Sequence, residues 1–206
     1  LRQRLARRGE LDDTLILLVS DHGATSVHTH LDLADWFRAR GARTLAHPIL
    51  WERDPTAAVM VAGNGSAMVY ARPGEPRAER WPLARLRSPE AFGTGCDVVT
   101  ALLAADAVAL VAAESGDGAV VVLSREGEAQ LRWRDGKIAW TPRTADVLGL
   151  GPAREATARH WLEQGWDGPW PDAAYQLLDQ FRSRRTGDLV VIAREGSDFR
   201  RRFAIP

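Results

Sequence analysis

An uninterrupted apolar run near the N-terminus constrains the fold of this chain more than any other feature. Residues 14–20, TLILLVS, contain no charged side chain and lead directly into Asp21, His22 and Gly23. A strand that is apolar at every position, rather than at every second one, is typical of burial on both faces. The run therefore predicts a strand inside a mostly parallel sheet flanked by helices, with a polar site at the strand's carboxyl end.

Predicted strands and helices alternate along the rest of the chain. Further strands are predicted at residues 57–63, 66–72, 107–114 and 187–196. Helices are predicted at residues 1–9, 31–41, 97–106, 154–165 and 171–183. Residues 115–145 differ, because three short β runs follow one another there, and Asp135-Gly136 is a strong hairpin signal. We expect one α/β domain over residues 1–206, with a β-rich insertion or cap at about 115–145.

Charge and cysteine content exclude several classes of function. Lys plus Arg number 27 and Asp plus Glu number 27, so the formal net charge is zero and a nucleic acid polymer is not favoured as a partner. The single cysteine, Cys96, excludes an intrachain disulfide and a metal site built from several cysteines. No apolar run approaches the length that would cross a bilayer.

Asp21 and His22 are the candidate metal ligands. A carboxylate oxygen and a neutral imidazole nitrogen both bind zinc well, and adjacent positions at a strand end can hold one ion. Gly23 lets the chain turn away without crowding the ion. Alternatively, Asp21 caps the next segment and His22 is an exposed loop residue. Spacing alone leaves both interpretations open.

Three further residues are candidates for substrate contact. The spacing of His28 and His30 places both side chains on one side of an extended segment, where they could contact a substrate phosphate. They could equally be surface residues before the helix predicted at 31–41. Asn64 lies at a strand end, where its amide could bind a phosphate oxygen, although a plain turn with Gly65 explains it as well.

The stretch DTLILLVSDHG, residues 13–23, resembles the second metal-ligand motif of the alkaline phosphatase superfamily. The most similar branch is that of the type I phosphodiesterases and nucleotide pyrophosphatases. The resemblance continues in order through VHTHLDLADWFRARG, AAVMVAGNGSAMVYARPGE and TGDLVVIAREGSDFR, and so extends over nearly the whole chain. It implies an alkaline-phosphatase-like sandwich core, with a mostly parallel sheet between helices.

The resemblance also implies a reaction. Such enzymes hold two divalent ions, usually zinc, and act on small phosphorylated substrates such as nucleotides or phosphodiesters. Asp21 and His22 match the Asp-His pair that holds one of the ions. In the family a Thr or Ser nucleophile attacks phosphorus, while one ion activates the attacking oxygen and the other stabilises the leaving oxygen.

This chain lacks the family's other functional residues. The nucleophile and further ligands of the family lie upstream of the matched motif, and a last histidine lies downstream of the matched segments. We therefore expect a central to C-terminal fragment, incomplete at both ends, that contains no catalytic residue and is inactive alone. The compartment, cytoplasmic or exported, is not predicted.

Two alternative functions remain compatible with the resemblance. Sulfatases, phosphomutases and phosphonate hydrolases share the fold and related ligand sets, and the upstream nucleophile would distinguish them. A superfamily member that has lost catalysis could also serve as a binding module.

Overall fold

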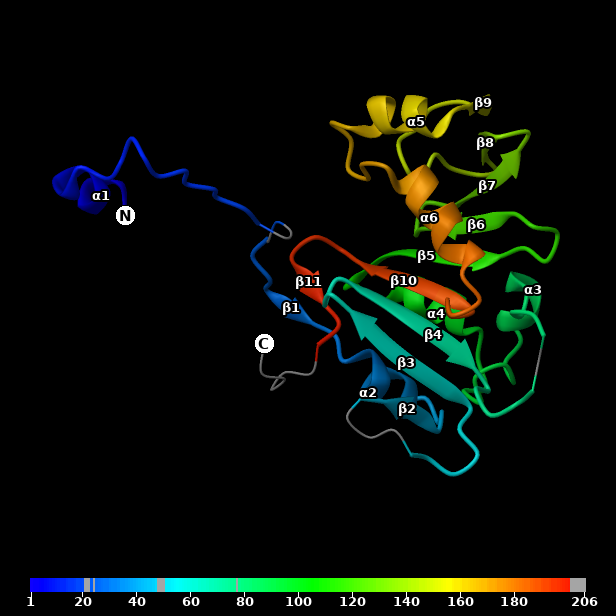
Figure 1. The fold of residues 1–206 in the computed structure, drawn as a ribbon. Helices are drawn as coiled ribbons and strands as arrows, with labels where there is room; N and C mark the ends of the chain where they lie inside the picture. The colour runs from blue at the N-terminus through cyan, green and yellow to red at the C-terminus, as the bar shows by residue number, and fades with distance from the viewer. Residues whose placement is uncertain (21–22, 24, 48–50, 77, 201–206) are drawn as a thin grey trace.

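The computed structural model describes residues 1–20, 23, 25–47, 51–76 and 78–200 of the chain (Figure 1). The large sheet consists of β2 (Thr44–Ala46), β3 (Ala57–Ala62), β4 (Ser66–Ala71), β5 (Val108–Glu114), β6 (Val120–Leu123), β7 (Glu128–Arg134), β8 (Lys137–Pro142), β9 (Arg154–Ala156) and β10 (Leu189–Ala193). A small sheet consists of β1 (Thr29–His30) and β11 (Ser197–Asp198). The helices in these ranges are α1 (Arg2–Arg8), α2 (Leu33–Arg38), α3 (Leu83–Leu86), α4 (Val98–Ala104), α5 (Ala158–Gly165) and α6 (Ala173–Arg182).

The large sheet confirms the α/β class but corrects the strand direction. Its order is β2-β3-β4-β10-β5-β6-β7-β8-β9, and every neighbouring pair is antiparallel except β2 and β3. The prediction of a mostly parallel sheet is therefore wrong for this part of the chain. Strands β5, β6 and β10 are apolar at consecutive positions because they are buried on both faces, and two-sided burial imposes that pattern whatever the strand direction.

Two hydrophobic cores lie on opposite faces of the large sheet. Along β5, Val111 and Ala113 belong to the core that includes α2, α3 and α4. Leu110 and Ala112 point the other way, into the core that includes α5 and α6. Since successive side chains of a strand alternate between its faces, one apolar strand serves both cores. Figure 1 shows α5 and α6 beside β6, β7 and β8.

The apolar run at residues 14–20 does not form the predicted strand. Its side chains are exposed, with Leu18 at 99% and Val19 at 88% relative exposure. Figure 1 shows this segment extended between α1 and β1, away from the large sheet. A β-strand needs a neighbour to complete its hydrogen-bond ladder, and within the described ranges no strand pairs with this run. Its sequence has strand character, but the described part of the chain offers no partner strand to bury it.

Turn and cap residues account for several confirmed boundaries. Gly9, at φ 69°, ends α1, and Asp32 caps α2 by accepting a hydrogen bond from the Asp35 amide at 3.0 Å. The predicted hairpin turn at Asp135 and Gly136 has positive φ at both residues, 48° and 75°, which suits the tight turn between β7 and β8.

Candidate functional site

The pairing of β1 with β11 brings together residues that are far apart in the sequence. The two strands run parallel, and His30 lies opposite Asp198. The His28 amide donates to the Gly196 carbonyl at 2.8 Å, and the Leu31 amide donates to the Asp198 carbonyl at 2.9 Å. These backbone bonds fix the histidine segment against the chain that leaves β10.

His30, Asp198 and Arg200 form a cluster around one buried carboxylate. The Asp198 side chain is 2% exposed, its Oδ1 lies 2.7 Å from Nδ1 of His30, and its Oδ2 accepts a hydrogen bond from Nε of Arg200 at 2.9 Å. Burial raises the pKa of Asp198, but the hydrogen bonds from His30 and Arg200 outweigh that effect and hold the pKa below its usual value. The carboxyl group is therefore ionised at neutral pH.

The ionised carboxylate determines how the His30 ring is used. A carboxylate only accepts hydrogen bonds, so Nδ1 of His30 must carry the proton between them. Nε2 is then the nitrogen that is available to a ligand, and 44% of the His30 side chain is exposed. Carboxylate-oriented histidines of this kind are common where the other nitrogen binds a metal or a substrate.

Asn64 lies beside the same segment, in the turn between β3 and β4. The Phe199 amide donates to the Asn64 carbonyl at 2.9 Å, and the Ala193 amide donates to the Gly65 carbonyl at 2.8 Å. Asn64 has φ 63°, after Gly63 at φ 58°, so it occupies a left-handed position that Asn tolerates better than most residues. The turn interpretation of Asn64 is thus observed, and its exposed side chain leaves the phosphate contact as a prediction.

Residues 196–199 bring the three predicted substrate-contact residues to one end of the large sheet. His28 and His30 bond or pack against Gly196 and Asp198, and Asn64 bonds to Phe199. Figure 1 shows β1 and β11 together beside the end of β3 and β4 that carries this turn. The sequence placed His28 and His30 on one extended segment and Asn64 at a separate strand end, and the structure places all three around one short segment.

Sequence reasoning missed Asp198 and Arg200. Both follow a turn that begins after β10, in a stretch that resembles the family as a whole but has no recognisable ligand spacing. His30 and Asp198 are separated by 168 positions, and only the pairing of two very short strands joins them. The one local signal is an acid placed directly before Phe199, which is 1% exposed.

The predicted metal ligands Asp21 and His22 lie outside the described residues, so their role stays a prediction. Within the described ranges, no group of three or more His, Cys, Asp or Glu side chains is arranged to hold a metal ion. In that same part of the chain, no helix has the length and apolar character needed to cross a membrane.

Comparison with known proteins identifies the family. The model of the type I phosphodiesterase/nucleotide pyrophosphatase family matches residues 1–206, which is the whole chain. No curated protein matches it, and no solved structure does. Members of the matched family are hydrolases of phosphoric ester bonds that act on small phosphodiesters and nucleotides, and they are generally metal-dependent. The chain belongs to the type I phosphodiesterase/nucleotide pyrophosphatase family, a branch of the alkaline phosphatase superfamily.

Proposed function

We propose that this chain is part of a metal-dependent hydrolase that cleaves phosphodiesters or nucleotide pyrophosphate bonds. The observation that carries the proposal is the family match over residues 1–206. In this proposal the reaction uses two divalent ions, zinc by preference, and a Thr or Ser nucleophile that this chain does not contain. The 206-residue chain alone is then inactive.

Asp21 and His22 are proposed to hold one of the two ions. Their carboxylate and imidazole are suitable zinc donors, and Gly23 after them leaves room for the turn. A bound ion supplies Lewis-acid stabilisation of charge on the phosphoryl oxygens. In this proposal the other residues of the candidate site position the substrate.

His30 is proposed to contact a phosphate oxygen of the substrate. Asp198 fixes the ring through Nδ1, so that Nε2 is held in one orientation. When the imidazole is protonated, Nε2 donates a hydrogen bond to a phosphate oxygen, and the buried Asp198 carboxylate stabilises the positive ring. Orientation by a buried partner matters because a preorganised donor loses little freedom when the substrate binds.

His28 and Asn64 are proposed as weaker substrate contacts. Both side chains are exposed and both residues bond through their backbone to residues 196–199, which also pair with the segment of His30. Strands β6, β7 and β8 fall within the β-rich insertion predicted at about 115–145 and continue the sheet away from β10. We propose that they are an addition to the hydrolase core with no direct part in hydrolysis.

The proposal is tested by hydrolysis of bis(p-nitrophenyl) phosphate with the full-length natural protein that contains this chain, loaded with zinc. We expect His22→Ala to abolish turnover and to lower the bound zinc. A double His28→Ala, His30→Ala variant should lower turnover while zinc content is unchanged. His160→Ala, which removes an exposed imidazole on α5, is the matched control and should change neither.

The outcomes separate the alternatives. Full turnover and zinc content in His22→Ala would contradict the ligand assignment. No turnover by a folded, zinc-loaded natural protein would contradict the diesterase proposal. Turnover of a sulfate ester instead would then assign the protein to the sulfatase branch. Hydrolysis by the 206-residue chain alone would show that the chain supplies its own nucleophile.

A further inference from the structure

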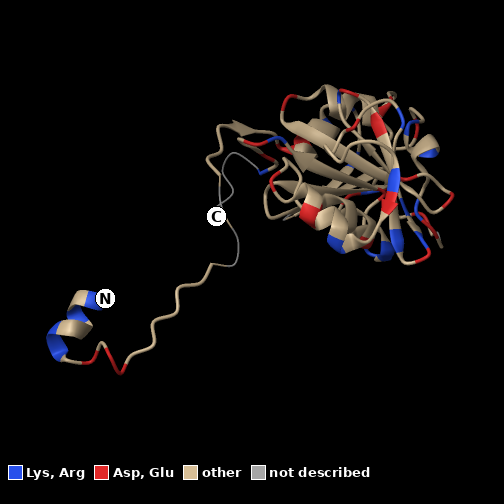
Figure 2. Cartoon of the chain, turned by 90° about the horizontal axis from the view of Figure 1, so that it is seen from above, with Lys and Arg blue, Asp and Glu red and all other residues tan. Residues whose placement is uncertain are grey.

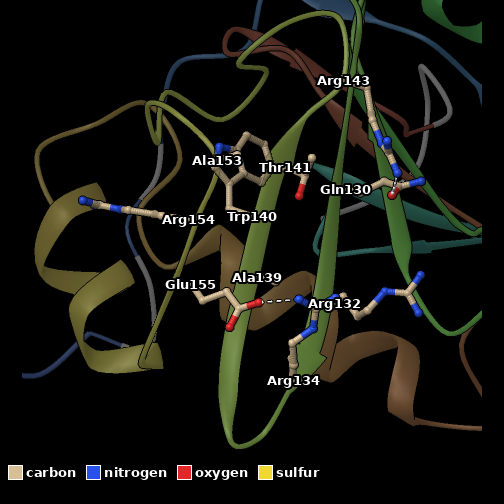
Figure 3. A pocket seen from close by; sticks show the side chains of 10 residues that line it. All are labelled: Gln130, Arg132, Arg134, Ala139, Trp140, Thr141, Arg143, Ala153, Arg154 and Glu155. Carbon is tan, nitrogen blue, oxygen red and sulfur yellow. Dashed lines mark hydrogen bonds and ion pairs between the residues drawn. The ribbon is translucent and has the colours of Figure 1, made fainter.

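An arginine-lined groove lies on the large sheet at the opposite edge from β2, on β7, β8 and β9 (Figure 3). Its volume is about 450 Å³. Strands β5 and β6 separate it from β10, which leads into the cluster of His30 and Asp198. The groove is therefore separate from the cluster of His30, Asp198 and Arg200.

The strand alternation explains why this face is hollow. On β7, Leu131 points into the core, whereas Arg132 and Arg134 point to the opposite face. Ala139 of β8 lies between Arg132 of β7 and Glu155 of β9 in the strand register. Because Ala139 is small, it forms the floor of the groove, and the longer side chains of Arg132 and Glu155 form its walls. None of the helices in the described ranges covers this face, so the walls are open to solvent (Figure 3).

The charges of the groove are incompletely balanced. Nη1 of Arg134 forms an ion pair with Oε1 of Glu155 at 2.7 Å, and Arg132 is paired with Asp117 in the loop before β6. Nη2 of Arg143 donates to the neutral amide oxygen of Gln130 at 2.7 Å. Among the described residues, no carboxylate forms an ion pair with Arg143.

Arg154 of β9 lies opposite Trp140 in the strand register, so its guanidinium is on the α5 face of the sheet and does not add to the charge of the groove. Its Cζ lies 4.8 Å from the centroid of the Trp161 ring, and Figure 3 shows it pointing toward α5. Within the described ranges it too forms no ion pair with a carboxylate. The groove thus presents three arginines, Arg132, Arg134 and Arg143, against one carboxylate of its own, Glu155.

We propose that this groove is an accessory site for a small anion that carries several phosphate groups. Guanidinium forks match phosphate oxygens in pairs, and the volume falls in the range of small-molecule sites. A nucleic acid polymer fits less well, because it needs an extended basic path. Figure 2 shows Lys and Arg interspersed with Asp and Glu around the sheet, and the formal net charge of the chain is zero.

The test is calorimetric titration of the chain with inorganic tripolyphosphate in buffer that contains a metal chelator. The chelator removes metal-dependent binding and hydrolysis, so the result does not depend on the proposed function. We expect one bound anion per chain. Arg143→Gln should weaken binding about three- to tenfold, the range for a partly exposed charged hydrogen bond. Arg53→Gln, which removes a guanidinium on a side chain that is 95% exposed and outside the groove, should leave the affinity unchanged.

Glu155→Gln provides a test with the opposite sign. It removes the one carboxylate of the groove and frees Arg134 at nearly constant size, so tripolyphosphate should bind more tightly. Circular dichroism spectra identical to wild type will show that each variant is folded. Absence of binding to the wild type, or equal weakening by Arg143→Gln and Arg53→Gln, would overturn the proposal. Weaker binding to Glu155→Gln would also overturn it.

Discussion

Replacing Asp198 by Asn tests whether the buried carboxylate holds the candidate site together. The change keeps the size of the side chain but removes the charge that His30 and Arg200 share. Hydrogen bonds to charged groups contribute about 1.5–3 kcal/mol each. One acceptor oxygen remains in the amide, and the His30 and Arg200 side chains are 44% and 30% exposed, so water replaces part of the loss. We therefore expect the free energy of unfolding at pH 7 to fall by about 1–2 kcal/mol.

The pH dependence of this loss identifies its cause. The folded pKa of Asp198 is lowered, so its carboxylate stabilises the fold fully above the unfolded pKa of about 3.9 and loses that effect as the pH falls through the folded value. The amide side chain of the Asp198→Asn variant does not titrate. The part of the difference in unfolding free energy that comes from the Asp198 charge should therefore be present at pH 7 and shrink below about pH 4.

Urea unfolding followed by tryptophan fluorescence measures this difference, since the chain has eight tryptophans and Trp140 and Trp161 are fully buried. Asp106→Asn is the control, because it removes the carboxylate of an ion pair with Arg125 on a side chain that is 93% exposed. The control should change the unfolding free energy much less than the Asp198 variant does. A loss at Asp198 that stays the same from pH 7 to pH 3 would refute the electrostatic explanation and indicate a packing defect.

Three further predictions concern Asp117, Gly196 and Leu18. Hydrogen bonds from Ser115 and Arg132 lower the pKa of Asp117 to about 2, which carbon NMR of its carboxyl group measures. Arg132→Gln should raise this pKa, and the same pKa in the variant would contradict the role of Arg132. The ion pair of Asp117 should be present above about pH 4 and lost between pH 4 and pH 2. Gly196→Ala should lower the free energy of unfolding by about 1 kcal/mol, measured in urea, because φ is +78°, a conformation that strains a residue with a Cβ atom; an unchanged value would contradict this reasoning. Leu18→Ser should leave thermal stability within about 0.5 kcal/mol of wild type, because the leucine is 99% exposed; a larger loss would show that the segment is packed in solution.

The sequence predicted elements better than their pairing. The hairpins β3–β4 and β7–β8 were predictable because their turn residues and their apolar runs are local signals. Strand direction in the sheet was not predictable. Strands β5 and β10 are apolar at consecutive positions, as the strands of a parallel sheet are, but they pair antiparallel. Residues 14–20 show the same limit, because strand character in a sequence does not supply a neighbouring strand.

The residue types of the candidate site were predictable from the sequence, but the segment that brings them together was not. His28, His30 and Asn64 were found because their side-chain chemistry suits a phosphate ligand, although each has an ordinary structural explanation. What joins them is the backbone of residues 196–199, in which Gly196 and Asp198 bond to the histidine segment and Phe199 bonds to the β3–β4 turn. Backbone hydrogen bonds leave no residue-type signature, and β1 and β11 are each two residues long, too short for periodicity to appear. No sequence pattern shows that Asp198 is buried; in the structure its buried charge requires partners, and the candidate site forms where His30 and Arg200 supply them.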